Sequence, residues 1–192
     1  MPERKPLIIT TSREPSRRTR SFLKDLVQTI PASIKFNRGK ATLQDLASIA
    51  RRRGAYGVLI VLERKANPSA LLYTEPTPEG LERKVLLKIW SVSLIREIPD
   101  CQRPIGIDKL ILNTRSVPEE GLAGEAADAL ALIFRPILTD KEILDAVEMI
   151  VGEGEKGVKI SFICTSTGRP CGPRFTVLKV VRYGGEQGER RQ

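Results

Sequence analysis

The chain has 192 residues, of which 41% are hydrophobic and 29% are charged, as is typical of a soluble globular protein with a sizeable core. Its formal net charge of +9 favours a polyanionic partner, and no apolar run approaches the roughly 20 residues that a membrane span needs. Because the chain contains no histidine, a Ser-His-Asp triad and the usual nitrogen ligands of zinc are excluded.

The chain opens with a strand, a helix and a second strand. The apolar run 7–12 predicts a buried strand, and Ser16 is a suitable N-cap for a helix that ends before Pro31. Residues 33–36 predict a short strand, and residues 37–40 predict a turn. A second helix is predicted over 42–53, with Leu43, Leu46, Ala47 and Ala50 buried and Gly54 as its stop.

Strand-like segments follow, up to a boundary at 99–104. Strands are predicted over 58–62, 70–74 and 84–98, with a proline-containing loop over 75–80. Beyond the boundary, the sequence predicts a strand over 107–113 and a helix over 119–134. A further helix is predicted from an Asp140 cap to Gly152, buried through Ile143, Leu144, Val147 and Ile150. A hairpin is predicted from strands 158–165 and 175–183, followed by a mobile tail over 184–192.

The two halves repeat one pattern. The run Leu7-Ile8-Ile9-Thr10-Thr11 recurs as Leu110-Ile111-Leu112-Asn113-Thr114, although the second half lacks a clear equivalent of the strand over 33–36. Residues 1–100 contain 19 Lys and Arg against 10 Asp and Glu, whereas residues 101–192 contain 13 of each. Helices alternating with strands predict an α/β fold with a mixed sheet, and all the net positive charge lies in the first half.

The three cysteines, Cys101, Cys164 and Cys171, have no C-x-x-C spacing, which argues against a zinc site. Cys164 and Cys171 flank the predicted hairpin tip. A disulfide between them is one interpretation if the source is a hyperthermophile, and a pair of buried thiols is the interpretation that the sequence favours.

A candidate anion site lies where the first strand leads into the first helix. Arg13, Arg17, Arg18 and Arg20 lie at or just before the helix N-terminus, where cations oppose the helix macrodipole. A bound phosphate would remove this conflict, since free helix N–H groups, hydroxyls and arginines together bind anions. The alternative is that these arginines are solvated and pair with Glu14 and Asp25.

Other basic segments carry weaker signals. The turn Asn37-Arg38-Gly39-Lys40 is a second basic element, whereas the dipole at a helix C-terminus fully explains Arg51-Arg52-Arg53. Arg169 and Arg174 bracket the second hairpin tip, within reach of a backbone phosphate. Aromatic residues make up only 5% of the chain and form no ladder with Lys or Arg, so base stacking is not indicated.

An ordered set of residues resembles the Brix-domain family of ribosome-biogenesis proteins. The set comprises Thr10-Thr11-Ser12-Arg13, Pro15-Ser16, a helix with Phe22, Lys24 and Leu26, then Pro31 and Asn37-Arg38-Gly39, with Leu59-Ile60-Val61, Pro68 and the helix from Gly121-Leu122 to Phe134 further on. The likeness is closest to the branch that acts on the small-subunit precursor. Without long charged extensions, the chain resembles the minimal archaeal form. It departs from the family at 77–83, where a glycine-and-aromatic stretch is expected, so contacts of that stretch are not carried over.

The resemblance implies a single domain over 1–183, with a basic half (1–98) and a neutral half (104–183) related by pseudo-twofold symmetry. Each half would be similar to the anticodon-binding domain of class IIa aminoacyl-tRNA synthetases. It also implies a cytoplasmic, non-catalytic factor that binds ribosomal RNA precursors, needs no cofactor or metal, and has a possible protein assembly partner. In a eukaryote it would be nucleolar.

The leading hypothesis is therefore an RNA-binding ribosome assembly factor acting in pre-rRNA processing. Its predicted RNA-binding residues are Arg13, Arg17, Arg18, Arg20, Arg38, Lys40, Ser12 and Ser16. The main alternative is a protein-interaction scaffold whose neutral half docks a partner while the basic half only steers. A DNA-binding protein and an enzyme rank lower, because neither a recognition helix nor an acid–base constellation is visible.

Overall fold

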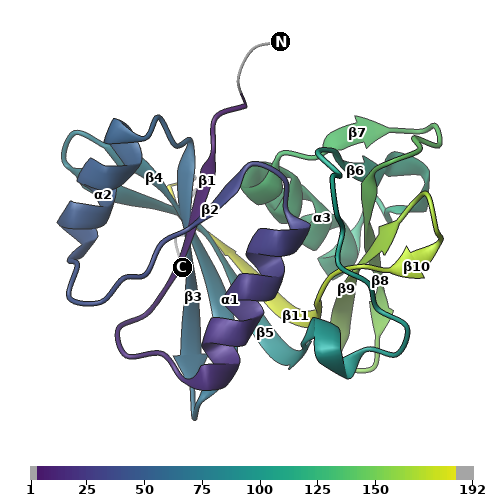
Figure 1. Ribbon diagram of the computed structural model, residues 1–192, viewed down its shortest axis with the longest axis horizontal. Helices are drawn as coiled ribbons and strands as arrows, with labels where there is room; N and C mark the ends of the chain where they lie inside the picture. The colour runs from purple at the N-terminus through teal and green to yellow at the C-terminus, as the bar shows by residue number, and fades with distance from the viewer. Residues whose placement is uncertain (1–3, 185–192) are drawn as a thin grey trace, which may run out of the picture.

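The computed structural model describes residues 4–184, which fold around one eleven-stranded mixed sheet (Figure 1). The first half contains β1 (Leu7–Thr11), α1 (Arg17–Thr29), β2 (Ser33–Lys35), α2 (Leu43–Arg52), β3 (Gly57–Arg64), β4 (Asn67–Thr77), β5 (Gly80–Ser93) and the 3-10 turn η1 (Ile95–Glu97). The second half contains β6 (Leu110–Asn113), the 3-10 turn η2 (Thr114–Ser116), α3 (Gly121–Phe134), β7 (Ile137–Thr139), β8 (Val147–Gly154), β9 (Gly157–Cys164), β10 (Arg169–Pro170) and β11 (Arg174–Arg182).

The strand order is the same in the two halves when each is followed from the edge of the sheet to its centre. The order across the sheet is β2-β1-β3-β4-β5-β11-β9-β8-β6-β7, with β10 paired to β9. β1 is parallel to both β2 and β3, and β6 is likewise parallel to β7 and β8. The antiparallel pair β5–β11 joins the halves. The predicted mixed α/β sheet is therefore confirmed.

Helix α1 has the boundaries that the sequence predicts. Ser16 is the N-cap, and its side chain accepts a hydrogen bond from the backbone N–H of Thr19. The helix ends at Thr29, before Pro31, because proline cannot supply the next helical hydrogen bond. The apolar stripe of α1 is buried through Phe22, Leu23 and Leu26.

The main hydrophobic core joins the two halves. Side chains of α1 and α3 pack into one cluster with β1, β3–β6, β8, β9 and β11. The rings of Phe22 on α1 and Phe175 on β11 meet edge-to-face, with centroids 6.0 Å apart. Helix α2 covers the other side of the first half, where Ala50 packs with Ile8 and Ile60 (Figure 1). The prediction that Leu43 is buried was wrong, because it begins α2 and is 44% exposed.

The helix predicted over 140–152 is wrong. Residues 147–154 form β8, in which Val147, Met149 and Val151 are buried and alternate with partly exposed residues. Leu144, which the helix would have buried, is 70% exposed. α3 is therefore the one α-helix in the described part of the second half, and that half has no counterpart of α2. It does have a counterpart of β2, since β7 pairs with β6, so the predicted absence of such a strand was also wrong.

Three further predictions need correction or lie outside the described residues. The predicted loop over 75–80 is mostly strand, because β4 continues to Thr77 and pairs with Gly80 across a tight turn. The strand predicted over 84–98 begins earlier, at Gly80, and gives way to η1. The predicted hairpin of β9 and β11 is confirmed by their antiparallel pairing. The predicted mobile tail lies outside the described residues from 185 onward.

Cys164 and Cys171 form a disulfide, with their Cα atoms 5.6 Å apart, so the favoured prediction of two buried thiols was wrong. The bridge closes a short loop between β9 and the segment before β11. It therefore reduces the conformational entropy of the unfolded chain only modestly. Reduction should lower the free energy of unfolding by about 2 kcal/mol, an effect that denaturant melts with and without reductant would measure. Cys101→Ser, which leaves the bridge intact, is the control, and an unchanged melt on reduction would contradict the prediction.

Candidate nucleic-acid interface

A cavity of about 540 Å³ opens at the carboxyl ends of the parallel strands β1 and β2. The chain leaves β1 for α1 on one face of the sheet and leaves β2 for α2 on the other face. Two loops that diverge in this way open a crevice between them, and such switch points are where α/β sheets generally bind ligands. The lining residues are Thr11, Glu14, Pro15, Arg20, Leu23, Lys35, Phe36, Asn37, Arg38, Gly39 and Lys40.

The crevice is strongly cationic. Four of its lining residues are basic, namely Arg20, Lys35, Arg38 and Lys40, against a single carboxylate, Glu14. Lys35 was not predicted as a site residue, although its place at the end of a strand before the basic turn was a usable signal. The sequence also separates Arg20 and Arg38 by a whole helix and strand, and the switch point brings them together. The geometry thus brings four basic side chains of the first half together at one place.

Arg38 is the most constrained cation of the crevice. Its Nε donates to the carbonyl of Ala41 at 3.2 Å, and its Nη1 lies 3.5 Å from the carbonyl of Thr11. Burial, followed by the nearby charge of Arg13, lowers the pKa of Arg38. The guanidinium is thus held by backbone carbonyls beside another cation, and no described carboxylate bonds to it. A bound anion would offset both the burial and the repulsion.

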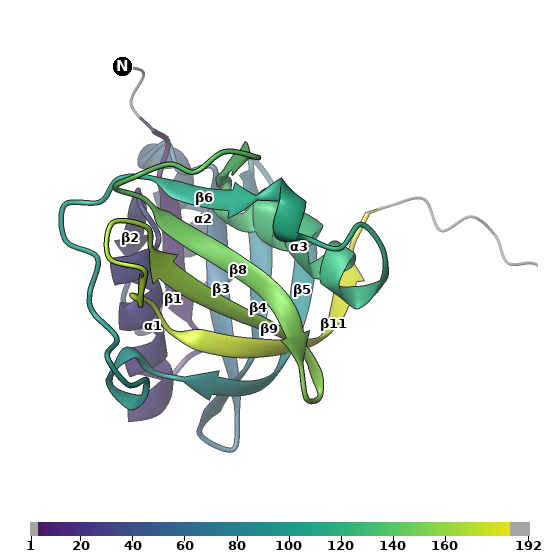
Figure 2. The same cartoon turned by 90° about the vertical axis from the view of Figure 1, so that its right-hand side faces the viewer.

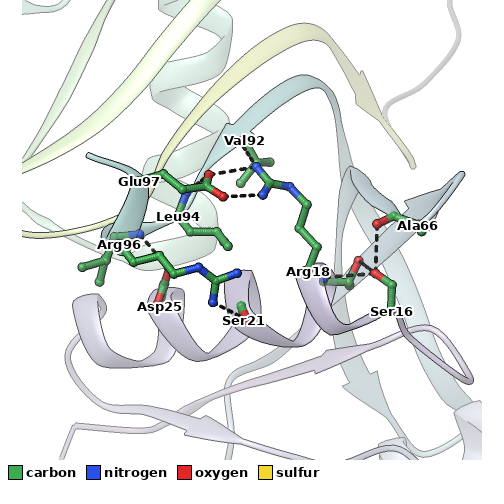
Figure 3. A network of polar contacts seen from close by, with 11 residues as sticks. Ser16, Arg18, Ser21, Asp25, Ala66, Val92, Leu94, Arg96 and Glu97 are labelled. Atoms are coloured by element: carbon green, nitrogen blue, oxygen red, sulfur yellow. Dashed lines mark hydrogen bonds and ion pairs between the residues drawn. The ribbon is translucent and has the colours of Figure 1, made fainter. Parts of the chain in front are cut away.

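Arg18 does not face the crevice. Its guanidinium forms two bonds with Glu97, of 2.5 and 2.9 Å, and its Nη2 donates to the carbonyl of Val92 at 2.8 Å (Figure 3). The bond from Arg18 lowers the pKa of Glu97, whose carboxylate also accepts from the N–H of Leu94. Arg18 therefore ties α1 to η1, whereas the sequence predicted it among the phosphate-binding arginines.

Ser16 and the N-terminus of α1 are also occupied from within the protein. Glu63 of β3 accepts hydrogen bonds from the backbone N–H of Ser16 at 3.0 Å and from the Thr19 hydroxyl at 2.6 Å. The Ser16 hydroxyl donates to the carbonyl of Ala66 (Figure 3). The negative charge of Glu63 thus complements the helix macrodipole, so the predicted conflict is relieved without a phosphate at the first turn.

We expect Glu63→Gln to destabilise the fold by about 1 kcal/mol at neutral pH, since it removes the charge at the N-cap of α1. Burial raises the pKa of Glu63, but the hydrogen bonds from Thr19 and Ser16 together lower it by more, so the pKa is lower than usual. A lowered folded-state pKa contributes stability that is present above the unfolded pKa and is lost as the pH falls through the folded value.

Thermal melts from pH 7 to pH 3 would test this expectation. The stability gap between wild type and Glu63→Gln should narrow as the pH falls below the unfolded pKa of a glutamate, about 4.3, and should close as the pH falls through the lower folded value. Glu79→Gln, an exposed turn position, is the matched control and should leave the curve unchanged. A gap that persists undiminished at pH 3 would mean that the Glu63 charge does not stabilise the helix.

Most of the remaining predicted residues are open to solvent. Arg13, Arg17, Arg20 and Lys40 are exposed. Ser12 is half-buried, and its N–H donates to the carbonyl of Val61 at 3.0 Å. The structure therefore gathers Arg20, Arg38 and Lys40 at one crevice with Ser12 and Arg13 on the adjoining loop, Arg17 at the start of α1, and Arg18 and Ser16 turned to other partners.

In the described part of the chain, no helix is both long and apolar enough to cross a membrane, and no three His, Cys, Asp or Glu side chains gather as metal ligands. The fold is that of a mixed α/β protein whose two halves share one strand order.

Comparison with known proteins identifies the family. No protein-family profile matches the chain. A probable Brix domain-containing ribosomal biogenesis protein from Aeropyrum pernix is 35% identical over 176 residues, covering 89% of this chain and 94% of the relative. The protein of the same description from Pyrococcus horikoshii is 40% identical over 200 residues, covering 94% of this chain and 87% of the relative. The chain belongs to the Brix-domain family of ribosomal biogenesis proteins, as the ordered motif in its first half predicted.

Solved structures agree with this assignment. The crystal structure of a probable ribosomal biogenesis protein from Aeropyrum pernix matches with a TM-score of 0.75 and 32% identity, covering 91% of this chain and 96% of that one. An archaeal Imp4-like protein has the same fold, with a TM-score of 0.69 at 21% identity, covering 92% of this chain and 99% of that one.

Proposed function

We propose that the chain is a non-catalytic ribosome assembly factor that binds ribosomal RNA precursors at the crevice between β1 and β2. The observation that carries this proposal is the gathering of four basic side chains around one carboxylate at a switch point of the sheet. Phosphate contacts dominate the affinity of proteins for nucleic acids, and such a crevice fits a phosphate backbone. The names of the relatives place them in ribosome biogenesis, which fits an RNA ligand.

The proposed RNA-binding set differs from the one that the sequence suggested. Arg18 is left out because its guanidinium already bonds to Glu97. Ser16 is left out because its N–H already bonds to Glu63 and its hydroxyl bonds to the carbonyl of Ala66. Lys35 is added because it lines the crevice. The resulting set comprises Arg13, Arg17, Arg20, Lys35, Arg38 and Lys40, with Ser12 contributing a hydroxyl.

The salt dependence of binding to structured RNA tests the proposal. If about five phosphates are neutralised, log affinity should fall against log salt with a slope of roughly −3.5 to −4.5. Fluorescence anisotropy of a labelled precursor fragment, titrated at several salt concentrations, would give this slope. An affinity that does not change with salt would contradict a phosphate-binding crevice, and equal affinity for duplex DNA under the same conditions would contradict RNA as the ligand.

Three finer features belong to the same proposal. The shared strand order supports two duplicated halves about a pseudo-twofold axis. On the family resemblance, we assign each half a likeness to the anticodon-binding domain of class IIa aminoacyl-tRNA synthetases. We also assign the chain to pre-rRNA processing in the small-subunit branch, on the motif in residues 10–39. Competition between small-subunit and large-subunit precursor fragments tests the branch, and preference for the large-subunit fragment would contradict it.

One observation favours the scaffold as a second candidate function. The edge strand β7 presents Ile137 and Leu138 to solvent, with the exposed fraction of Leu138 at 58%. An apolar edge strand can pair with a strand from another chain. A protein complex that survives nuclease treatment and is lost in Leu138→Glu would support this function, whereas a complex that nuclease dissolves would contradict it.

A further inference from the structure

A second cationic surface lies where the two halves of the sheet meet, far along the chain from the crevice. Strands β5 and β11 pair antiparallel, and their register shifts between Thr176 and Val177. Thr176 pairs with Ser91 and Val177 with Ile89, so Trp90 is the extra residue of a bulge on β5. Bulges commonly re-aim a side chain, and here the only tryptophan of the chain is 55% exposed.

No described helix covers this face of the second half. The core side of β9 and β11 is marked by the buried Ile160, Phe175 and Val177, which pack with α1 and α3. Residues that alternate with them, including Lys159 and Thr176, point to the opposite side. β8 and β9 face the viewer in Figure 2 without a helix in front of them. The first half covers the corresponding side with α2.

On this face, two positive charges lie opposite each other across the β5–β11 pair. Lys88 on β5 and Lys179 on β11 are direct cross-strand partners, and both are exposed. Like charges opposite each other destabilise a sheet unless an anion lies between them. Lys159 is the cross-strand partner of Thr176, which places a third cation beside the bulge. No ion pair joins Lys88, Lys159 or Lys179 to a described carboxylate.

A cavity of about 600 Å³ lies beside the indole. It is lined by Trp90, Ser91, Glu153, Gly154, Glu155, Lys156, Lys159, Arg174 and Thr176. Its three cations outnumber its two carboxylates, and the Nζ of Lys156 lies 4.3 Å from the centroid of the Trp90 ring. The free protein therefore keeps a cation on the indole face, held by a turn of the β8–β9 hairpin rather than by the core.

We propose that the face around Trp90 binds single-stranded RNA, with one base stacked on the indole and the flanking phosphates held by Lys88, Lys159 and Lys179. The inference rests on the proposed function, which it extends to the junction of the two halves. For this surface, the opposed lysines favour a polyanion over an apolar or basic protein segment. Stacking on an aromatic ring is stronger than an exposed cation–π contact, so a base displaces Lys156, whose ammonium then pairs with a phosphate.

The fluorescence of Trp90 reports directly on binding at this face. We expect a ten-nucleotide oligouridylate to quench the fluorescence of the full chain, and a ten-base-pair RNA duplex to quench it much less, since duplex bases are not free to stack. Trp90→Ala should weaken oligouridylate binding by roughly 10-fold in an anisotropy titration, while Trp90→Phe should retain most of the affinity. Leu43→Ala, an exposed apolar residue on α2, is the matched control and should bind like wild type.

The outcomes separate this proposal from the crevice. If the indole signal does not change while anisotropy reports bound oligouridylate, the face around Trp90 does not contact RNA, and the crevice proposal stands. If Trp90→Ala binds RNA with wild-type affinity, the surface is not an RNA site, and a protein partner is the better assignment. A variant with the charges of Arg20 and Lys40 reversed tests the crevice separately. If this variant keeps both its affinity for structured RNA and its Trp90 quenching, the crevice proposal alone fails.

Discussion

Arg20→Glu combined with Lys40→Glu should weaken binding to structured precursor RNA about 100-fold near physiological salt. Arg20 lines the crevice from the first turns of α1 and Lys40 from the loop after β2, so the double reversal places two carboxylates where the proposal places phosphates. Arg38 would keep its bonds to backbone carbonyls and would gain an acidic neighbour in place of the anion. The loss should come with a salt slope shallower by about two, since two phosphate contacts disappear.

The matched control is Arg51→Glu combined with Arg52→Glu. It makes the same change of net charge in the same half, but these residues are exposed in the last turn of α2 and do not line the crevice. Reversal there opposes the helix dipole at roughly 0.3–1 kcal/mol for each residue, which a thermal melt would detect separately from binding. Equal losses of RNA affinity in the two double variants would mean that binding depends on net charge alone and not on a site.

The local signals in the sequence were sufficient for the first helix. Ser16 and Pro31 bracket an apolar stripe with helical spacing, and both boundaries act within a few residues. The motif in residues 10–39 likewise predicted the family. These features succeed because capping and helix termination are decided by neighbouring residues, which the sequence displays directly.

The segment 140–152 shows where local signals fail. Apolar residues at 143, 144, 147 and 150 fit one face of a helix, whereas 147, 149 and 151 fit one side of a strand. Pairing decided the outcome, because β8 forms hydrogen bonds with β6 on one side and β9 on the other. β6 precedes β8 in the sequence and β9 follows it, so no window of a dozen residues contains both partners.

The candidate site divides in the same way. Residue type and spacing predicted a basic cluster, but not which cations are free. Arg18 is bonded to Glu97, 79 positions away, and Ser16 is bonded to Glu63, 47 positions away. Both carboxylates are brought to α1 by tertiary packing alone. Charge patterns therefore predicted where the positive charge lies, and only the structure separated the cations that stabilise the fold from those that face a ligand.

Phe22→Ala should lower the free energy of unfolding by about 3–5 kcal/mol, as expected for truncating a fully buried aromatic side chain. Phe22 is fully buried on α1, and its ring packs edge-to-face on Phe175 of β11, at the junction of the two halves. Tyr56 adds a second link between the halves. Its hydroxyl donates to the carbonyl of Ile133 at 2.8 Å, and the guanidinium of Arg135 lies 4.0 Å from its ring centroid.

Because these contacts cross between the halves, the loss should be shared by the whole domain. Denaturant unfolding of Phe22→Ala should remain one transition by both far-UV circular dichroism and Trp90 fluorescence, shifted to lower denaturant. In a cycle with Phe175→Ala, the double variant should lose about 0.5–1.5 kcal/mol less than the sum of the two separate losses, because each single variant already removes the ring–ring contact. Leu43→Ala, which truncates an exposed side chain, is the control. Two separate transitions, with only the first half destabilised, would show that the halves fold independently and that the shared core does not couple them.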